Sequence, residues 1–458
     1  MDAIRDGVPV QRLSRRRLLA AAAGAAATPT LLRLAAPAAA AAAREQTSTT
    51  ITAMTPETDL YNDPKNVALF EKLNPGITLR VVAFDPVRLS AALASGQPPD
   101  FVRTLGGPEI ANYAARGLCT NLDPYFAKSS VLHVSDLHPI NDEYRFDGKT
   151  QGQGPRYGMG KDWSQDGTIW YNKALFRRAG VAYPSATEPL TFDELLALGK
   201  KLTLRKGGKI QVYGLNAEFG IYMEFHMLQL MAQQGKPLFN ADYTKIDCTS
   251  PEARKILKFY FDYAQARIGP SPLDPEANWD GIIYPVNRVA IAQWGYWFGG
   301  LINIPGKNGQ SVTESGIAPA PLMGPHRVSG CAGPAGSWIP QGSRNRDAAW
   351  KLFEFYHGGQ PARDRAAGGY GLPSLKSLFP LLPHNTPYQK AAVQVQQTEL
   401  KHVAVLRYSP YITSDAFDAI FTKYMTAAVT GQSSLDDAAR GMETAYNNRL
   451  RLGKAQVS

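Results

Sequence analysis

Alternating strand and helix patterns near the start of the chain constrain its fold more than any other feature. Strands are predicted at 51–54, 77–84 and 98–104, and helices at 65–73 and 86–94. The segment "ITLRVVAF" is rich in β-branched and aromatic residues, and "NPG" before it ends the first helix. Strands separated by single helices at this spacing pair in parallel through crossovers. The pattern therefore predicts an α/β fold.

The middle and the end of the chain repeat this alternation. "TIWYNKALFRRAG" runs from a strand into a helix that ends at Gly180, and "PLTFDELLALGKKLT" is an amphipathic helix with Thr191 as its N-cap and Glu194 completing a capping box. Further helices are predicted at 222–234, 251–266, 346–355, 414–429 and 435–450. Short strands are expected at "RYGMG" and "SWIPQ". Each lies between two larger α/β blocks, so the chain could cross from one block to the other there.

The length favours more than one compact core. A chain of 458 residues exceeds the usual size of a single domain. No repeat of solenoid period is present. Two α/β lobes are the simplest arrangement, and several crossings between them would create a cleft with a hinge.

The N-terminus, residues 1–43, has the pattern of a twin-arginine export signal. "SRRRLL" precedes a weakly apolar run and an alanine tract with several A-x-A cleavage options. We therefore expect an extracellular or periplasmic protein at the outer face of the cytoplasmic membrane. The first cysteine is Cys119, so a lipid anchor on a cysteine of the signal is not expected.

Charge and cysteine content exclude several classes of function. Without residues 1–43 the chain has 43 basic and 37 acidic residues, and the basic ones are dispersed, which argues against a nucleic-acid partner. The three cysteines are widely spaced and allow at most one disulfide. No metal-binding motif is present, and we expect neither a metal nor a cofactor.

The search for catalytic motifs finds no positive signal for an enzyme. The sequence lacks GxSxG and HExxH. Three acids, Asp162, Asp166 and Glu218, lie beside aromatic residues in glycine-rich segments. Paired carboxylates for glycoside cleavage remain an alternative, but we interpret these acids as hydrogen-bond acceptors for ligand hydroxyls.

Aromatic residues are concentrated in predicted loops and at strand ends. Sugar rings pack their C–H faces on flat aromatic surfaces, while their hydroxyls require polar partners. The pattern favours a carbohydrate-binding site. The aromatic candidates are Trp163, Tyr222, Trp279, Trp294, Tyr296, Trp297, Trp338 and Tyr370. Within "IAQWGYW", Tyr296 and Trp297 are ranked above Trp294 as ligand contacts.

Several blocks together resemble the extracellular solute-binding proteins of ABC importers, in particular the carbohydrate-binding group called family 1. The resemblance covers most of residues 50–458. The matching blocks are "FEKLNPGITLRVV", "LSAALASGQPPDFV", "YGMGKDWSQDGTIWYNKALFRRAGVAYP", "TFDELLALGKKLT", "RVAIAQWGYW" and "SWIPQGSRNRDAAWKLFEFYHGG".

The resemblance implies a type II periplasmic-binding-protein-like fold, in which two α/β lobes joined by a multi-crossing hinge enclose a ligand cleft. Lobe 1 would comprise residues 48–157 and 337–385, and lobe 2 residues 158–336 and 386–458. The family pattern places these ligand-binding residues in the cleft: Tyr61, Asp63, Arg103, Thr104, Asp162, Trp163, Glu218, Tyr222, Trp294, Tyr296, Trp297, Trp338 and Tyr370.

The same resemblance implies capture without chemistry. A monomeric binding protein would take up a sugar or oligosaccharide and deliver it to the permease subunits of an ABC transporter. Two alternatives stay open: an exported carbohydrate-active enzyme, and a binder of another solute, such as a peptide or polyamine, on the same fold. Arg103 leaves an acidic sugar possible as the ligand.

Overall fold

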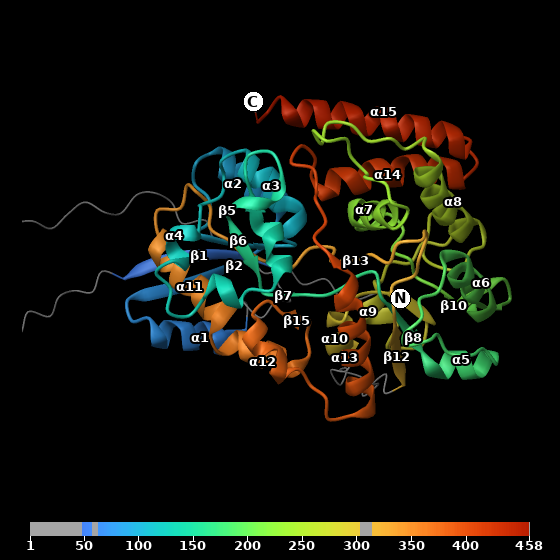
Figure 1. Ribbon diagram of the computed structural model, residues 1–458, viewed down its shortest axis with the longest axis horizontal. Helices are drawn as coiled ribbons and strands as arrows, with labels where there is room; N and C mark the ends of the chain where they lie inside the picture. Colours follow the sequence, from blue (N-terminus) through green and yellow to red (C-terminus); the bar gives the residue numbers. More distant parts are fainter. Residues whose placement is uncertain (1–47, 57–62, 303–313, 458) are drawn as a thin grey trace, which may run out of the picture. The chain divides into compact units, whose positions relative to one another are not determined.

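Two β-sheets with separate apolar cores organise the part of the chain that the computed structural model describes, residues 48–56, 63–302 and 314–457 (Figure 1). The predicted export signal at 1–43 and the predicted site residue Tyr61 lie outside these ranges. Within them, no helix combines the length and the apolar character needed to cross a bilayer.

The first sheet has five strands in the order β2-β1-β3-β14-β6. β1 pairs in parallel with β2 and β3, as predicted, because helices α1 and α2 carry the chain back between them. The strands predicted at "RYGMG" and "SWIPQ" form β6 and β14, which are antiparallel neighbours in this sheet. The bounds are β1 (Thr49–Thr55), β2 (Ile77–Ala83), β3 (Phe101–Thr104), β6 (Gly158–Gly160), β14 (Gly336–Trp338), α1 (Pro64–Leu73) and α2 (Pro86–Ala94).

Helices around this sheet bury its apolar side chains. Phe101 of β3 meets Phe353 of α11 edge to face, with ring centroids 6.4 Å apart. The predicted helix at 346–355 is confirmed and extends to Gly358. The other helices of this region are α3 (Gly107–Ala115), α4 (Asp123–Phe126), α11 (Arg346–Gly358) and α12 (Gln360–Gly368).

The second sheet has three strands in the order β11-β8-β12, and both of its pairings are antiparallel. Its strands are β8 (Ile169–Asn172), β11 (Ile291–Gln293) and β12 (Ser315–Ala318). It therefore differs from the first sheet, although the sequence alternation looks similar. A long connection with several helices separates β8 from β11, so no single crossover determines the strand direction.

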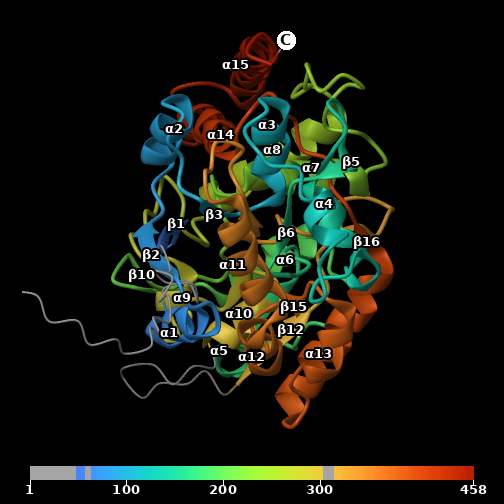
Figure 2. The ribbon, with the colours of Figure 1, turned by 90° about the vertical axis from the view of Figure 1, so that its left-hand side faces the viewer.

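The helices of this second region include those predicted from capping and periodicity. Thr191 and Glu194 form the predicted capping box at the start of α6. α14 and α15 pack against each other (Figures 1 and 2), with the rings of Phe417 and Tyr446 4.2 Å apart. The bounds are α5 (Lys173–Ala179), α6 (Phe192–Leu202), α7 (Met223–Gln233), α8 (Pro251–Gln265), α9 (Asp280–Ile283), α10 (Trp297–Ile302), α13 (Pro387–Glu399), α14 (Ser414–Val429) and α15 (Leu435–Lys454).

Short strands in two-stranded ladders complete the described structure. They are β4 (Arg145–Phe146), β5 (Gln151–Arg156), β7 (Asp162–Trp163), β9 (Leu204–Lys206), β10 (Lys209–Val212), β13 (Ser329–Gly330), β15 (Leu372–Pro373) and β16 (Val403–Ala404). The 3₁₀ helices are Val134–Asp136, Pro139–Tyr144, Lys376–Leu381 and Leu400–His402. All three cysteines are buried and unpaired.

Two connecting segments link the sheets and lie side by side. Residues 161–168 lead from β6 to β8, and residues 319–335, which include β13, lead from β12 to β14. The Lys161 N–H donates to the Ala335 carbonyl at 2.8 Å, and the Asp166 N–H donates to the Gly330 carbonyl at 3.1 Å. Side chains of these segments therefore meet residues of both regions.

Candidate functional site

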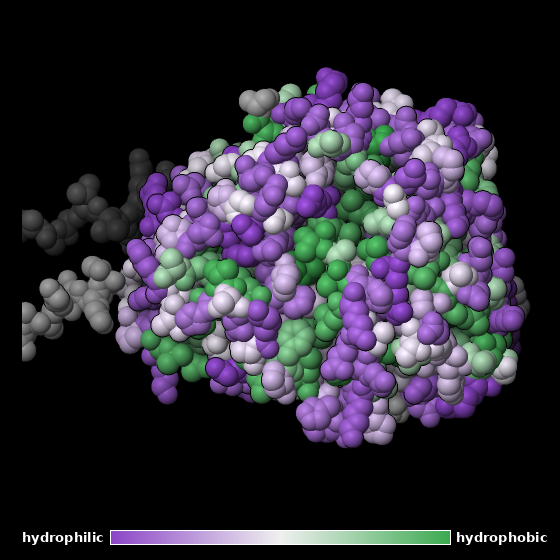
Figure 3. Space-filling model, viewed as in Figure 1, coloured by the Kyte–Doolittle hydropathy of each residue, from purple (hydrophilic) through white to green (hydrophobic). Residues whose placement is uncertain are grey.

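A cavity of about 180 Å³ opens beside these connecting segments. This volume is far above the roughly 10–15 Å³ that one water molecule requires, so a small organic molecule has room to enter. On the face shown in Figure 3, hydrophilic residues cover most of the outer parts, and apolar residues gather around a hollow in the middle.

Eight of the predicted site residues line this cavity, although they come from five separate stretches of the chain. They contribute two carboxylates, one guanidinium group and five aromatic rings. The eight are Arg103, Asp162, Trp163, Glu218, Tyr222, Trp294, Trp297 and Tyr370.

Four predicted residues lie elsewhere in the structure. Asp63 is exposed and caps α1, where its carboxylate accepts the N–H of Lys65 at 2.9 Å. Thr104 is buried, and its hydroxyl accepts the N–H of Gly106 at 3.2 Å. Trp338 is fully buried and stacks on Tyr113 in the core of the first sheet.

The fourth of these residues, Tyr296, points away from the cavity. Its ring lies near Gly369 and Pro383, in a separate small hollow. Trp294, ranked below Tyr296 from the sequence, lines the cavity instead. Neighbouring side chains of the turn before α10 diverge, and the sequence motif alone does not reveal their directions.

Several lining residues were missed from the sequence. Asp166 is expected from the sequence as an acceptor for ligand hydroxyls, but the family pattern does not include it among the cleft residues. Lys161 and Ser164 flank the predicted Asp162 and Trp163, and this adjacency was a usable signal. Gln293 and His226 carried no local signal, because they reach the cavity only through the packing of β11 and α7. These five residues all line the cavity.

The indole of Trp297 is held in place by hydrogen bonds to the connecting segments. Its Nε1–H donates to Asp166 Oδ1 at 3.1 Å, and its backbone N–H donates to the Ser164 hydroxyl at 3.4 Å. Asp166 Oδ2 accepts the N–H of Ala332 at 2.8 Å. Burial raises the pKa of Asp166 to about 7. A Cβ on Gly295 would lie 2.4 Å from Asp166 Oδ1, so this close approach requires glycine.

Four aromatic rings form a continuous wall of the cavity. Trp294 meets Trp297 at 5.2 Å and Tyr222 at 6.1 Å, both nearly edge to face. Trp297 in turn lies 6.3 Å from Tyr370. The Trp294 Nε1–H donates to the buried carboxylate of Asp280 at 2.8 Å. Hydrogen bonds to Asp166 and Asp280 thus fix the two indoles, and both indoles line the cavity.

Asp162 lies between two cations at the side formed by the first region. Lys161 Nζ is 2.8 Å from its Oδ2, and Arg365 pairs with the same oxygen. Both cations also lie 5.5 Å from the centre of the Tyr370 ring. These contacts neutralise the Asp162 charge and orient Tyr370.

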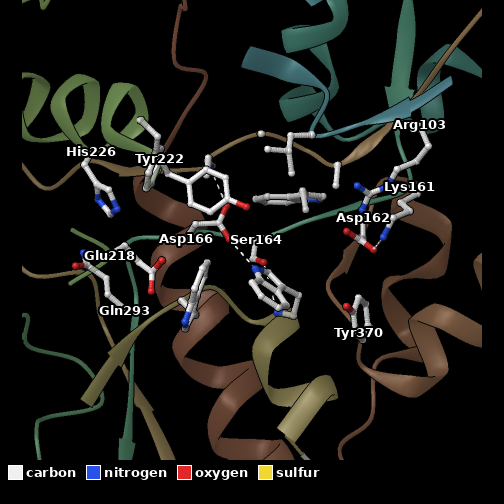
Figure 4. A pocket seen from close by; sticks show the side chains of 18 residues that line it. Arg103, Lys161, Asp162, Ser164, Asp166, Glu218, Tyr222, His226, Gln293 and Tyr370 are labelled. Carbon is white, nitrogen blue, oxygen red and sulfur yellow. Dashed lines mark hydrogen bonds and ion pairs between the residues drawn. The ribbon is translucent and has the colours of Figure 1, made fainter. Parts of the chain in front are cut away.

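The opposite side of the cavity carries Glu218, Gln293 and His226 (Figure 4). Burial raises the pKa of Glu218 well above its usual value, and the nearby Asp280 raises it further. Burial lowers the pKa of His226 to about 3, so its imidazole is neutral at physiological pH. Among the described residues, no group of His, Cys, Asp and Glu is arranged to hold a metal ion.

Helix α7 positions Tyr222 and His226 through a cap from a distant part of the chain. Tyr222 precedes the helix in a left-handed conformation with φ of 54°. The carboxylate of Asp418, in α14, accepts the N–H groups of Tyr222 and Met223 at 2.9 and 2.8 Å. The start of α7 therefore depends on α14.

Comparisons with known proteins agree with this architecture. Residues 50–357 match the family model described as "Bacterial extracellular solute-binding protein". A protein of Brucella abortus (strain 2308) that is named as a binding protein is 26% identical over 311 residues, which span 62% of this chain and 66% of that relative.

Solved structures show the same fold at low identity. An ABC substrate-binding protein from Listeria monocytogenes, in complex with cycloalternan, aligns with a TM-score of 0.72 and 21% identity over 88% of this chain and 98% of its own. An ABC transporter solute-binding protein from Thermotoga lettingae, bound with α-D-tagatose, aligns with a TM-score of 0.70 and 23% identity over 88% of this chain and 100% of its own. The chain belongs to the bacterial extracellular solute-binding protein family, and its α/β fold is the type II periplasmic-binding-protein fold expected from the sequence.

Proposed function

We propose that this protein is the extracytoplasmic substrate-binding component of an ABC importer, which captures a sugar or oligosaccharide and delivers it to a membrane permease. The observation that carries the proposal is the wall of Tyr222, Trp294, Trp297 and Tyr370 beside hydrogen-bonding acids. Flat rings receive the C–H faces of a sugar, and carboxylates accept its hydroxyls. The sugar ligands of the similar structures from Listeria monocytogenes and Thermotoga lettingae support the same class.

The proposal includes the organisation inferred from the sequence. The two lobes comprise 48–157 with 337–385 and 158–336 with 386–458, and the cleft residues come from both. Closure requires contacts that favour the closed state, and side chains from two lobes supply them. The protein is exported by the twin-arginine route, acts as a monomer, and binds its solute without converting it.

One observation favours a second candidate, a carbohydrate-active enzyme. Asp166 and Glu218 line the same cavity, and burial raises the pKa of both. Paired carboxylates of this kind perform glycoside cleavage in other proteins. Against it, both oxygens of Asp166 accept hydrogen bonds from Trp297 and Ala332.

The test is a binding screen on the purified mature protein. Intrinsic tryptophan fluorescence and thermal melting are followed against mono- and oligosaccharides, and the ligand is analysed chromatographically after incubation. We expect a saturable shift with the sugar recovered unchanged. Hydrolysis of the sugar would support the enzyme instead, and no response to any saccharide would contradict sugar binding.

A further inference from the structure

One end of the cavity presents hydrogen-bond acceptors that no described residue satisfies. Glu218 is 4% exposed and Gln293 is 2% exposed, and both line the cavity. The Gln293 amide nitrogen donates to the Gly167 carbonyl at 3.3 Å, whereas its Oε1 receives no hydrogen bond within the described structure. Among the described residues, none donates to the Glu218 carboxylate. Figure 4 shows this carboxylate turned toward the centre of the cavity.

These acceptors point to a ligand that donates hydrogen bonds. A buried acceptor left without a partner has lost its hydrogen bonds to water, so a ligand that donates to it is favoured. Oε1 of Gln293 is a buried acceptor of this kind. The two oxygens of Glu218 face the cavity beside it, which gives three acceptor positions for a ligand. His226 shares this end of the cavity and is neutral. It therefore brings no positive charge to balance Glu218.

The electrostatic surroundings favour a positively charged donor over a neutral one. Asp280 is fully buried nearby and adds to the negative potential at Glu218. The basic residues of the cavity, Arg103 and Lys161, lie on its opposite side (Figure 4). Lys161 is engaged there by Asp162 at 2.8 Å. At its own end of the cavity, no described residue offers Glu218 a cationic partner, and without one burial and Asp280 favour its neutral form. A bound ammonium group would lower the pKa of Glu218 and stabilise the carboxylate.

Aromatic faces at the same end add to this preference. The rings of Tyr222 and Trp294 are nearly perpendicular, with centroids 6.1 Å apart. Burial raises the pKa of the Tyr222 phenol, and the charge of the nearby Glu218 carboxylate raises it further. A cation beside such rings is attracted to their faces, and more strongly when it is desolvated.

We propose that Glu218, Gln293, Tyr222 and Trp294 form a subsite for a protonated amine, so that the captured solute is a sugar carrying a free amino group. A hydroxyl both donates and accepts, whereas an ammonium group has three donors and no acceptor. The ammonium group therefore matches the three acceptor oxygens and the negative charge together. This inference rests on the proposed function and narrows its ligand class.

The experiment is isothermal titration calorimetry of the mature protein with matched sets of three sugars. Each set contains an amino sugar, its neutral parent and its N-acetyl derivative, in the gluco, galacto and manno series, at a pH where the amine is protonated. In the series that binds, we expect the amino sugar to bind at least about tenfold more tightly than the parent, or about 1.4 kcal/mol. The N-acetyl sugar, which has lost the charge, should show no such gain.

Two variants test whether the preference comes from this end of the cavity. Glu218→Gln keeps the shape and removes the charge, so the ratio of the amino-sugar affinity to the parent-sugar affinity should fall toward one, whatever the change in the parent's own affinity. Asp162→Asn is the matched control, because it alters a lining carboxylate on the opposite side. It should affect both sugars alike and retain the preference. Thermal melting of each variant verifies that it is folded.

The outcomes separate this inference from the proposed function. Neutral sugars binding as tightly as amino sugars, or a preference that survives Glu218→Gln, would overturn the amine subsite and leave sugar capture intact. Binding of spermidine with no response to any sugar would support the amine subsite but contradict sugar capture. If neither saccharides nor spermidine bind, both proposals are wrong.

Discussion

At the scale of single residues, tryptophans of similar sequence context have different roles. Trp338 is fully buried against Tyr113, whereas Trp297 is half-buried at the cavity and is held by Asp166. The first ring therefore contributes to core packing. The second presents part of its surface to the cavity, where a sugar ring is proposed to lie.

Replacing these two residues should separate binding from stability. We expect Trp297→Ala to weaken sugar affinity at least about tenfold, because it removes the central ring of the aromatic wall. Trp338→Ala should lower the free energy of unfolding by about 3–5 kcal/mol, as for other large-to-small core changes. Calorimetry and urea denaturation measure the two effects. Global unfolding of Trp297→Ala would show that its role is in the core.

At the scale of elements, the site depends on how α7 begins. The helix has no side-chain cap of its own, and Asp418 of α14 accepts the N–H groups of Tyr222 and Met223. Tyr222 is thereby fixed at the cavity wall. The contact between α7 and α14 thus determines the geometry of the aromatic wall.

Removing this cap should affect both stability and binding. Asp418→Ala should cost about 1–2 kcal/mol of unfolding free energy, as for the loss of an N-cap, and should weaken sugar binding because Tyr222 loses its anchor. Thr191→Ala is the control, since it removes the cap of α6, which contributes no residue to the cavity. Urea denaturation measures the loss of stability, and calorimetry measures sugar binding. If both variants bound the sugar equally well, the role of Asp418 in positioning Tyr222 would be wrong.

At the scale of the whole molecule, buried and half-buried carboxyl groups have the largest effect on how stability depends on pH. In five of them burial is the largest cause of a raised pKa: about 7 for Glu109, Asp166 and Asp418, about 8 for Glu224 and about 6 for Asp280. Between the unfolded and folded pKa values, the folded state holds more protons than the unfolded state. Through these carboxyl groups, stability therefore falls as pH rises through this range.

Histidines oppose the trend below about pH 6.5, because burial lowers the pKa of His226 and His357 to about 3 and that of His138 to about 4. The carboxyl groups are more numerous and their effect extends to higher pH, so the net change is a fall.

We predict that the free energy of unfolding is higher near pH 5 than near pH 8, within the window between the ordinary carboxyl values of about 4 and the raised ones. Glu224→Gln should make the unfolding free energy depend less steeply on pH, by up to about 1.4 kcal/mol per pH unit, which is the contribution of one titrating proton. The backbone N–H of Ser409, which donates to Glu224 at 3.3 Å, keeps an acceptor in this variant. Urea denaturation across this pH range checks the prediction, and stability that rises with pH would contradict it.

Local sequence was sufficient for the three parallel strands of the first sheet and for most helices, but not for the antiparallel positions of β6 and β14. The alternation over residues 51–104 predicts the parallel pairing of β1 with β2 and β3, and Thr191 with Glu194 predicts the start of α6. These features depend on periodicity and capping between residues close in sequence. The acids and aromatics, together with the family resemblance, likewise indicated seven of the residues that line the cavity, and the resemblance added Arg103.

Strand direction in the second sheet, burial of side chains and much of the cavity lining depend on residues far apart in the sequence, and only the tertiary structure determines them. The antiparallel second sheet, the burial of Trp338 and the arrival of Gln293 at the cavity have no local pattern. Asp162 pairs with Arg365, and Tyr222 is capped by Asp418, across about two hundred residues in each case. Such contacts arise from packing between elements, because side-chain direction and burial depend on neighbours that the linear sequence does not place together.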